Sequence, residues 1–257
     1  STVDSRGNSI QDRRIPGNVQ RSPAPLAYAQ GVIGGALAGV FITIEGVEGS
    51  GKSTQIRRLQ ERMRQCALPA IFSKEPGGTA LGGEIRSLLL APHPSGESWC
   101  PQAELLLFYA DRAQHLAALI RPALAEGKIV VVDRFEDSSR AYQGASGVAE
   151  ESLRCLRELV LGGFHSDLTL VLDMDPVASL RRVEARNAAL GEAFQETRFD
   201  GETLAFHRRV RERFLEIARR EPRRVRIIEA DGDPDRVESA IWAEIQPLLQ
   251  RAGFGVA

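Results

Sequence analysis

The feature that most constrains the fold is a glycine-rich loop, GVEGSGKS at residues 46–53, because of what lies on either side of it. It follows the apolar, β-branched run VFITIE at 40–45 and precedes an amphipathic helical pattern over 52–65. The residues that match the spacing GxxxxGK[ST] are Gly46, Gly51, Lys52 and Ser53. In this setting the backbone N–H groups turn inward, and the helix N-terminus adds partial positive charge. We therefore predict a phosphate-binding loop, the alternative being a structural turn.

Short β-branched runs alternate with longer helical patterns along the rest of the chain. The other predicted strands are AIFS (70–73), IVVVD (129–133), LTLVLD (168–173) and VRIIEA (225–230). The predicted helices are 52–65, 102–126, 176–186 and one whose apolar face carries Phe206, Val210, Phe214 and Ile217. Strands that are apolar throughout are typical of sheets covered on both faces. The pattern predicts an α/β fold: a three-layer P-loop NTPase fold with a five-stranded parallel sheet flanked by helices and right-handed crossovers.

The loop and the third strand predict where a nucleotide and its metal ion bind. Nucleotide contacts are expected from Gly46, Gly49, Ser50, Gly51, Lys52, Ser53 and Thr54. Lys52 would bridge the β- and γ-phosphates, and the Ser53 hydroxyl would ligate Mg²⁺. Asp133, at the end of the third strand, suits the acidic residue that holds a metal-bound water. Its alternative is a charged residue that merely ends a strand.

Composition limits the other possibilities. Thirty-three basic and thirty-four acidic residues give a net charge of −1, which argues against a general nucleic-acid or membrane-surface protein. The three cysteines, Cys66, Cys100 and Cys155, form no CxxC pair, and the four histidines show no metal-binding spacing. We expect reduced, half-buried thiols in a cytoplasmic protein.

Residues 1–39 differ in composition from the rest, being rich in Ser, Asn, Gln, Arg, Gly and Pro and then in Ala and Gly. We predict a disordered N-terminal extension here and one domain over 40–257. A membrane span or signal peptide is disfavoured because the uncharged run from 22 to 44 is only weakly apolar. An organelle-targeting leader stays open, since Arg13 and Arg14 favour it and Asp4 and Asp12 do not.

Three further segments bear on what stands opposite the nucleotide. They are KEPGGT (74–79), FYADRAQH (108–115) and DRFEDSSRAYQG (133–144). With the glycine-rich loop, and in this order, they resemble the motifs of bacterial thymidylate kinases over about residues 40–250. The resemblance implies transfer of the γ-phosphoryl group of Mg²⁺-ATP to dTMP, giving dTDP, by a homodimeric enzyme. Rival interpretations are a kinase for another nucleoside monophosphate and a non-catalytic nucleotide-binding regulator.

The side chains for the acceptor follow from helical spacing and from the resemblance. Phe108 and Arg112 are four apart, so a ring and a guanidinium share one helix face. By resemblance Phe108 stacks on thymine and Arg112 contacts dTMP; a core aromatic and a solvated Arg are the alternatives. Arg134 is placed to touch the transferring phosphate, unless it only pairs with a nearby carboxylate.

Further substrate contacts are expected around these two groups. Ser138 with Tyr142, and Ser139 with Gln143, repeat the four-residue spacing if this segment is helical, although Ser138 could instead cap a helix. Glu48 sits inside the phosphate loop, where a carboxylate beside triphosphate is unfavourable, so we expect it to face away. By resemblance it meets the sugar 3′-hydroxyl of dTMP or a metal-bound water.

An arginine-rich segment completes the prediction. Thirteen arginines lie between Arg181 and Arg226, and the stretch at about 186–202 has no apolar periodicity, which indicates a mobile lid. The resemblance assigns it arginines that close over ATP: Arg182 for binding, and Arg186 and Arg198 for the transition state. Three positions depart from the family pattern. They are Thr197 beside Arg198 instead of an Asp, Lys74 instead of Arg, and Phe135 instead of a common Tyr.

Overall fold

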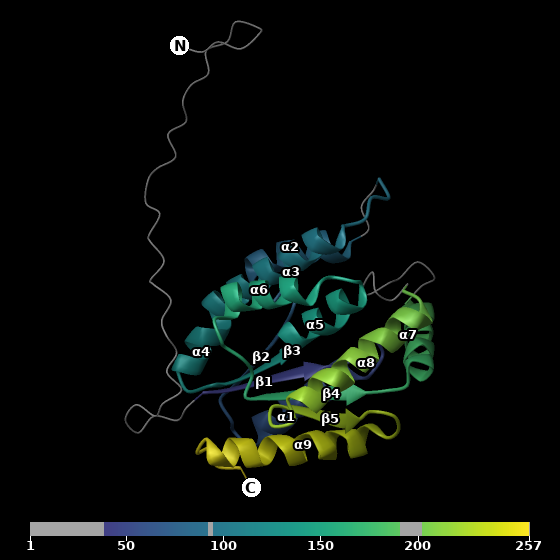
Figure 1. Cartoon of the computed structure of the whole chain (residues 1–257). Coiled ribbons are helices and arrows are strands. Elements are labelled where there is room, and N and C mark those ends of the chain that lie inside the picture. The colour runs from purple at the N-terminus through teal and green to yellow at the C-terminus, as the bar shows by residue number, and fades with distance from the viewer. Residues whose placement is uncertain (1–38, 92–94, 191–201, 257) are drawn as a thin grey trace, which may run out of the picture. The chain divides into compact units, whose positions relative to one another are not determined.

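The computed structural model describes residues 39–91, 95–190 and 202–256 (Figure 1). Its centre is a five-stranded sheet in the order β2-β3-β1-β4-β5. The strands are β1 (Val40–Glu45), β2 (Ala70–Lys74), β3 (Ile129–Asp133), β4 (Leu168–Asp173) and β5 (Val225–Glu229). Every pairing is parallel, which confirms the predicted sheet. The second strand is one residue longer and the fifth one residue shorter than predicted.

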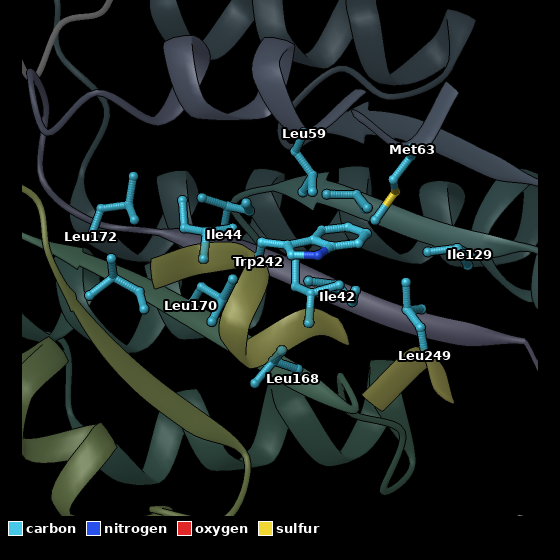
Figure 2. Close-up of a cluster of buried hydrophobic side chains, with 14 of the residues drawn as sticks. Ile42, Ile44, Leu59, Met63, Ile129, Leu168, Leu170, Leu172, Trp242 and Leu249 are labelled. Atoms are coloured by element: carbon cyan, nitrogen blue, oxygen red, sulfur yellow. The ribbon is translucent and has the colours of Figure 1, made fainter. Parts of the chain in front are cut away.

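One face of the sheet packs against α1 (Lys52–Gln65) and α9 (Pro234–Arg251), which lie side by side beneath it in Figure 1. Alternate residues of β1, among them Ile42 and Ile44, point to this face and are fully buried. Figure 2 shows the indole of Trp242 among them, close to Leu59 of α1. Each such side chain contributes about 1.5–3 kcal/mol through burial, so the strand that feeds the phosphate loop is held firmly.

The opposite face is covered by the helices between β2 and β5. Phe41, Val130 and Val132 point to it and pack on the helical segment predicted over 102–126. That segment is not one regular helix but α3 (Pro101–His115), a π-helical turn (Leu116–Ile120) and α4 (Arg121–Ala125). Pro122 explains the interruption, because it has no N–H to donate and its ring clashes with the preceding turn.

The remaining helices agree in part with prediction. In α8 (Leu204–Arg220) the predicted stripe of Phe206, Val210, Phe214 and Ile217 is buried, which confirms it. The segment after β3 is helical, as α5 (Glu136–Ala145), and α7 (Pro176–Leu190) runs four residues beyond its predicted end. Sequence reasoning did not predict α2 (Ala80–Leu90), α6 (Glu150–Leu161) or α9.

Two of the predicted segments lie wholly or largely outside the described residues, and the cysteines differ from prediction. The predicted extension at 1–39 lies outside it except for Gly39, and so do residues 191–201 of the predicted lid. The three cysteines are exposed rather than half-buried, because each lies on a solvent-facing turn, loop or helix face. Within the described ranges, no helix combines the length and apolar character that crossing a bilayer requires.

Candidate active site

A cavity of about 560 Å³ opens at the carboxyl ends of β1, β2 and β3, where ligands bind in open parallel sheets. It is lined by Glu48, Gly49, Gly51, Lys52, Ser53, Thr54, Lys74, Glu75, Pro76, Arg86, Leu90, Phe108, Arg112, Asp133, Arg134, Phe135, Ser138, Ser139, Tyr142, Gln143, Arg182 and Arg186. The structure thus brings most of the predicted site residues into one space.

The phosphate loop forms one end of this cavity, and its glycines are required by the backbone. Gly46 and Gly49 have φ of 139° and 73°, in the region that favours glycine. A Cβ on Gly46 would stand 2.6 Å from the Leu172 carbonyl oxygen, and one on Gly49 would stand 2.4 Å from that of Ser179. The loop can therefore lie directly on β4 and α7, with its other side turned to the cavity.

Lys52 lies across this loop. Its Nζ donates to the carbonyl oxygens of Gly46 at 3.1 Å and Val47 at 2.9 Å. Burial, reinforced by the positive charge of Arg134, lowers the pKa of Lys52 to about 8. A bound polyphosphate would add negative charge beside this buried ammonium and favour its charged form.

Asp133 and Ser53 are the groups that could hold a metal ion. One carboxylate oxygen of Asp133, Oδ1, is buried and has no hydrogen-bond partner in the described chain, while Ser53 is exposed to the cavity. Nowhere in the described ranges do three or more His, Cys, Asp or Glu side chains gather as a metal cage. This sparse set fits Mg²⁺, which is held by one or two carboxylates together with substrate phosphates and water.

Glu48 is held by two side chains from outside the loop. Its Oε1 accepts from Arg134 Nη2 at 3.0 Å and its Oε2 from the Tyr142 hydroxyl at 2.6 Å. Burial alone would raise the pKa of Glu48, but Arg134, Lys52 and Tyr142 outweigh it and lower this pKa. The carboxylate is therefore charged and aligned at the edge of the cavity.

Arg134 connects the loop to α5. Its guanidinium also donates to the Gly46 carbonyl at 3.1 Å and to Ser138 Oγ at 3.2 Å, and it lies 5.0 Å from the Tyr142 ring centroid. Its φ of 68° is uncommon for a residue with a side chain and is held by an N–H bond to Ile44. The alternative considered for Arg134 was an ion pair with a nearby carboxylate. That pair exists, with Glu48, and Arg134 also lines the cavity.

Behind Arg134 lies a carboxylate that the sequence did not single out. Glu45, at the end of β1, is fully buried and accepts from the Phe135 N–H at 2.8 Å and from Ser138 Oγ at 2.5 Å. Burial, with a smaller effect from Asp137, raises the pKa of Glu45 to about 8. Ser138 thus bonds to Glu45 and Arg134 rather than capping α5, whose N-cap is Phe135.

Arg112 is the centre of the other end of the cavity. It is only 1% exposed, and it donates through Nε to Glu75, through Nη1 to Ser139 and through Nη2 to the Phe135 carbonyl. Glu75 also meets His115 Nδ1 at 3.0 Å. Of the five guanidinium N–H groups, these contacts use three, so one on each Nη is left for a ligand.

Phe108, Gln143 and Lys74 flank this arginine. Phe108 is partly buried, one turn before Arg112 on α3. Gln143 is buried and donates to Glu104 Oε1 at 2.8 Å. Lys74 ends β2 with an exposed side chain. This end of the cavity is thus lined by the Phe108 ring, by the Gln143 amide held by Glu104, and by the cationic groups of Arg112 and Lys74.

Comparison with known proteins places this arrangement in a family. The family model described as thymidylate kinase matches residues 44–241. A thymidylate kinase of Caulobacter vibrioides is 48% identical over 84% of this chain and 99% of its own length. One of Syntrophotalea carbinolica is 45% identical over 83% and 98%. The crystal structure of thymidylate kinase from Ehrlichia chaffeensis has a TM-score of 0.63 and 31% identity, covering 80% of this chain and 98% of that one.

The chain belongs to the thymidylate kinase family. Two predicted loop residues of this family member, Gly46 and Ser50, do not line the cavity, since Gly46 faces β4 and Ser50 is buried behind the loop. Arg182 and Arg186 line it from α7, with Arg182 3.7 Å from Asp231. Arg198 lies outside the described residues.

Five residues that line the cavity were not predicted: Glu75, Pro76, Arg86, Leu90 and Phe135. Glu75 and Pro76 lie inside the KEPGGT segment, so the carboxylate within that motif was the available signal. Arg86 and Leu90 lie on α2, which was itself missed. No local pattern marks them.

Proposed function

We propose that this member of the thymidylate kinase family transfers the γ-phosphoryl group of ATP to the phosphate of dTMP, yielding dTDP and ADP. The observation that carries the proposal is that the phosphate loop and the side chains around Arg112 line one cavity. Two phosphorylated ligands can therefore meet end to end inside it. Such proximity replaces most of the entropic barrier to a reaction between two anions.

On the donor side, the loop amides and Lys52 would grip the β- and γ-phosphates. The proposed Mg²⁺, held by Ser53 and Asp133, would neutralise charge on the phosphate oxygens. Lys52 must leave the carbonyl oxygens of Gly46 and Val47 for this purpose, which its desolvated state favours. Arg182 and Arg186 of α7 lie at the same end of the cavity and would add positive charge around ATP.

On the acceptor side, the two remaining N–H groups of Arg112 would bind the dTMP phosphate, with Lys74 and Arg134 beside it. Phe108 would stack on the base, and Gln143, Ser138, Ser139 and Tyr142 would line its edge and the sugar. Glu48 would accept from the sugar hydroxyl. No general base is required, because a phosphate oxygen near neutral pH is already anionic.

The direct test is release of ADP in the presence of ATP and Mg²⁺ with dTMP, dUMP, dGMP or AMP offered separately. We expect turnover with dTMP and loss of it when Mg²⁺ is chelated. Turnover of AMP or dGMP but not of dTMP would contradict the proposal. Asp133→Asn should raise the Mg²⁺ concentration needed for half-maximal rate, whereas Glu126→Gln, an exposed carboxylate outside the cavity lining, should leave that concentration unchanged.

We also propose a homodimer. The adjoining helices α2, α3 and α6 expose Leu81, Leu88, Leu106 and Leu159 at 56–80%, and large exposed apolar groups gathered on neighbouring elements are typical of interfaces. Light scattering after gel filtration should give twice the chain mass. Leu106→Glu should give the monomer, and Ile227→Glu, on strand β5, should not.

Finally, we propose a cytoplasmic location. The support is the set of exposed, unpaired thiols of Cys66, Cys100 and Cys155, a state that reducing compartments maintain. Fractionation of cells that express the full chain tests it. Recovery with the membrane or an organelle would contradict it.

A further inference from the structure

His207, near the start of α8, has a surrounding that the proposed reaction does not yet explain. Its side chain is completely buried, and neither Nδ1 nor Nε2 has a hydrogen-bond partner in the described chain. A buried imidazole without partners loses its hydration without compensation. Buried polar groups without hydrogen bonds are rare in native proteins, so the position of this imidazole requires an explanation.

The nearest charged group is Glu48. His207 Nδ1 lies 3.7 Å from Glu48 Oε2, beyond hydrogen-bond distance but within reach of a small movement. The main chain of Glu48 is fixed separately, since Ser179 of α7 donates to its carbonyl oxygen. The carboxylate itself is held by Arg134 and Tyr142. The Glu48 carboxylate thus accepts two hydrogen bonds, from Arg134 and Tyr142, and His207 is placed to donate a third.

We infer that His207 is a positioning residue that takes over Glu48 when Arg134 leaves it for the transferring phosphate. The inference rests on the proposed function, in which Arg134 binds phosphate oxygens and Glu48 binds the sugar of dTMP. Without Arg134, Glu48 loses its nearest cation and keeps the Tyr142 hydroxyl, a main-chain N–H and the more distant charge of Lys52, in a place that is 6% exposed. If Nδ1 carries a proton, a small movement brings it within hydrogen-bond distance of Glu48. The resulting charge-assisted hydrogen bond would hold the carboxylate in place against the sugar of dTMP.

The arrangement specifies which nitrogen carries the proton. Only a proton on Nδ1 can face Glu48 attractively, since a lone pair there would oppose the carboxylate. An asparagine amide places its N–H groups near the position of Nδ1, while a glutamine amide reaches toward that of Nε2. Substitution by Asn, Gln and Leu therefore separates the hydrogen bond from mere filling of the core.

The experiment measures KM for dTMP, KM for ATP and kcat for these three variants. We expect His207→Leu and His207→Gln to raise KM for dTMP about tenfold, with KM for ATP and kcat within about twofold, and His207→Asn to recover most of the loss. In a Glu48→Gln background, His207→Leu should add almost nothing, because it acts through that carboxylate. His165→Leu, an exposed histidine, is the matched control.

Nitrogen-15 NMR gives a readout that does not depend on turnover. The chain has four histidines, so the signal that disappears in His207→Asn identifies His207. We expect the proton on Nδ1, and we expect its resonance to move downfield when dTMP is added. A proton on Nε2, an unmoved resonance, or a KM for dTMP that follows only the melting temperature of the variants would overturn the role of His207. Failure of the wild type to phosphorylate dTMP would instead overturn the proposed function and this inference with it.

Discussion

The two ends of the cavity present different kinds of atoms to a ligand. At the loop end, main-chain N–H groups, the Lys52 ammonium and the Ser53 hydroxyl come from one continuous stretch of sequence. At the Arg112 end, a buried guanidinium is held by Glu75, which follows β2, and by Ser139 and the Phe135 carbonyl, which belong to α5 and its N-cap. The loop end depends on local backbone geometry, and the Arg112 end depends on tertiary structure. Damage to the second should therefore cost stability as well as activity.

The largest expected effect is at Glu75. Glu75→Ala removes the only carboxylate that pairs with Arg112 in the described chain and leaves a guanidinium that is 1% exposed without its counter-charge. Breaking such a buried pair costs about 3–5 kcal/mol of the free energy of unfolding. Urea denaturation followed by circular dichroism measures it.

The control is Glu61→Ala, which removes an ion pair with Arg64 whose side chains are 50% and 72% exposed. Its effect on the free energy of unfolding should be close to zero, because solvent screens an exposed ion pair. Equal losses for the two variants would mean that the Arg112 end is no more dependent on its ion pair than the surface is.

Lys52→Ala should lower activity strongly and stability little, which is the reverse of the expected balance for Glu75→Ala. Within the described ranges its Nζ donates to two loop carbonyl oxygens alone, and burial together with the charge of Arg134 disfavours its ammonium form, so the fold should lose little. Removal of a cation that stabilises the transferring phosphoryl group should lower kcat about 100- to 1000-fold. Single-turnover kinetics and thermal melting are measured together. A stable variant with near-normal kcat would remove the loop end from the chemistry.

The difference between local backbone geometry and tertiary contacts also explains which parts of each end could be predicted from the sequence. The glycine-rich turn between β1 and α1, the five strands and the stripe on α8 depend on neighbouring residues or short periodicities, and the structure contains all of them. The helices α2 and α9 were missed because α2 carries two glycines and α9 contains Pro247, and both features lower the helical signal. Glu75 and Glu45 were missed because their partners lie 37 and 93 residues away. No local pattern encodes such distances.

A pH experiment sharpens the comparison at Glu45, which lies between the two ends. Because burial raises its pKa to about 8, the folded chain holds a proton on Glu45 that the unfolded chain releases near the usual value of 4.5. The stability gained is complete below pH 4.5 and is lost as the pH rises through 8. Glu45→Gln, which mimics the protonated form, should become the more stable protein by several kcal/mol at pH 8.5, since each unit of pKa shift corresponds to about 1.4 kcal/mol.

The measurement is the difference between the unfolding free energies of Glu45→Gln and wild type from pH 5 to 8.5. Glu61→Gln serves as control, since hydrogen bonds from Arg64 and Gln65 lower the pKa of Glu61 to about 2, outside this window. Parallel curves for Glu45→Gln and wild type would show that Glu45 is ionised throughout. The buried contact to Ser138 would then have to be a carboxylate contact.

The smallest effect is expected at Lys74, where this chain differs from the family pattern that its motifs resemble. Lys74 is exposed and ends β2 at the rim of the cavity, so an added guanidinium could gain a second hydrogen bond to the acceptor phosphate. Exposed charge contacts are worth about 0.2–1 kcal/mol, which corresponds to at most about a fivefold decrease in KM for dTMP in Lys74→Arg. Lys128→Arg, remote from the cavity, should change nothing. A decrease in KM for ATP instead would place Lys74 at the loop end, and the two ends could no longer be treated as separate.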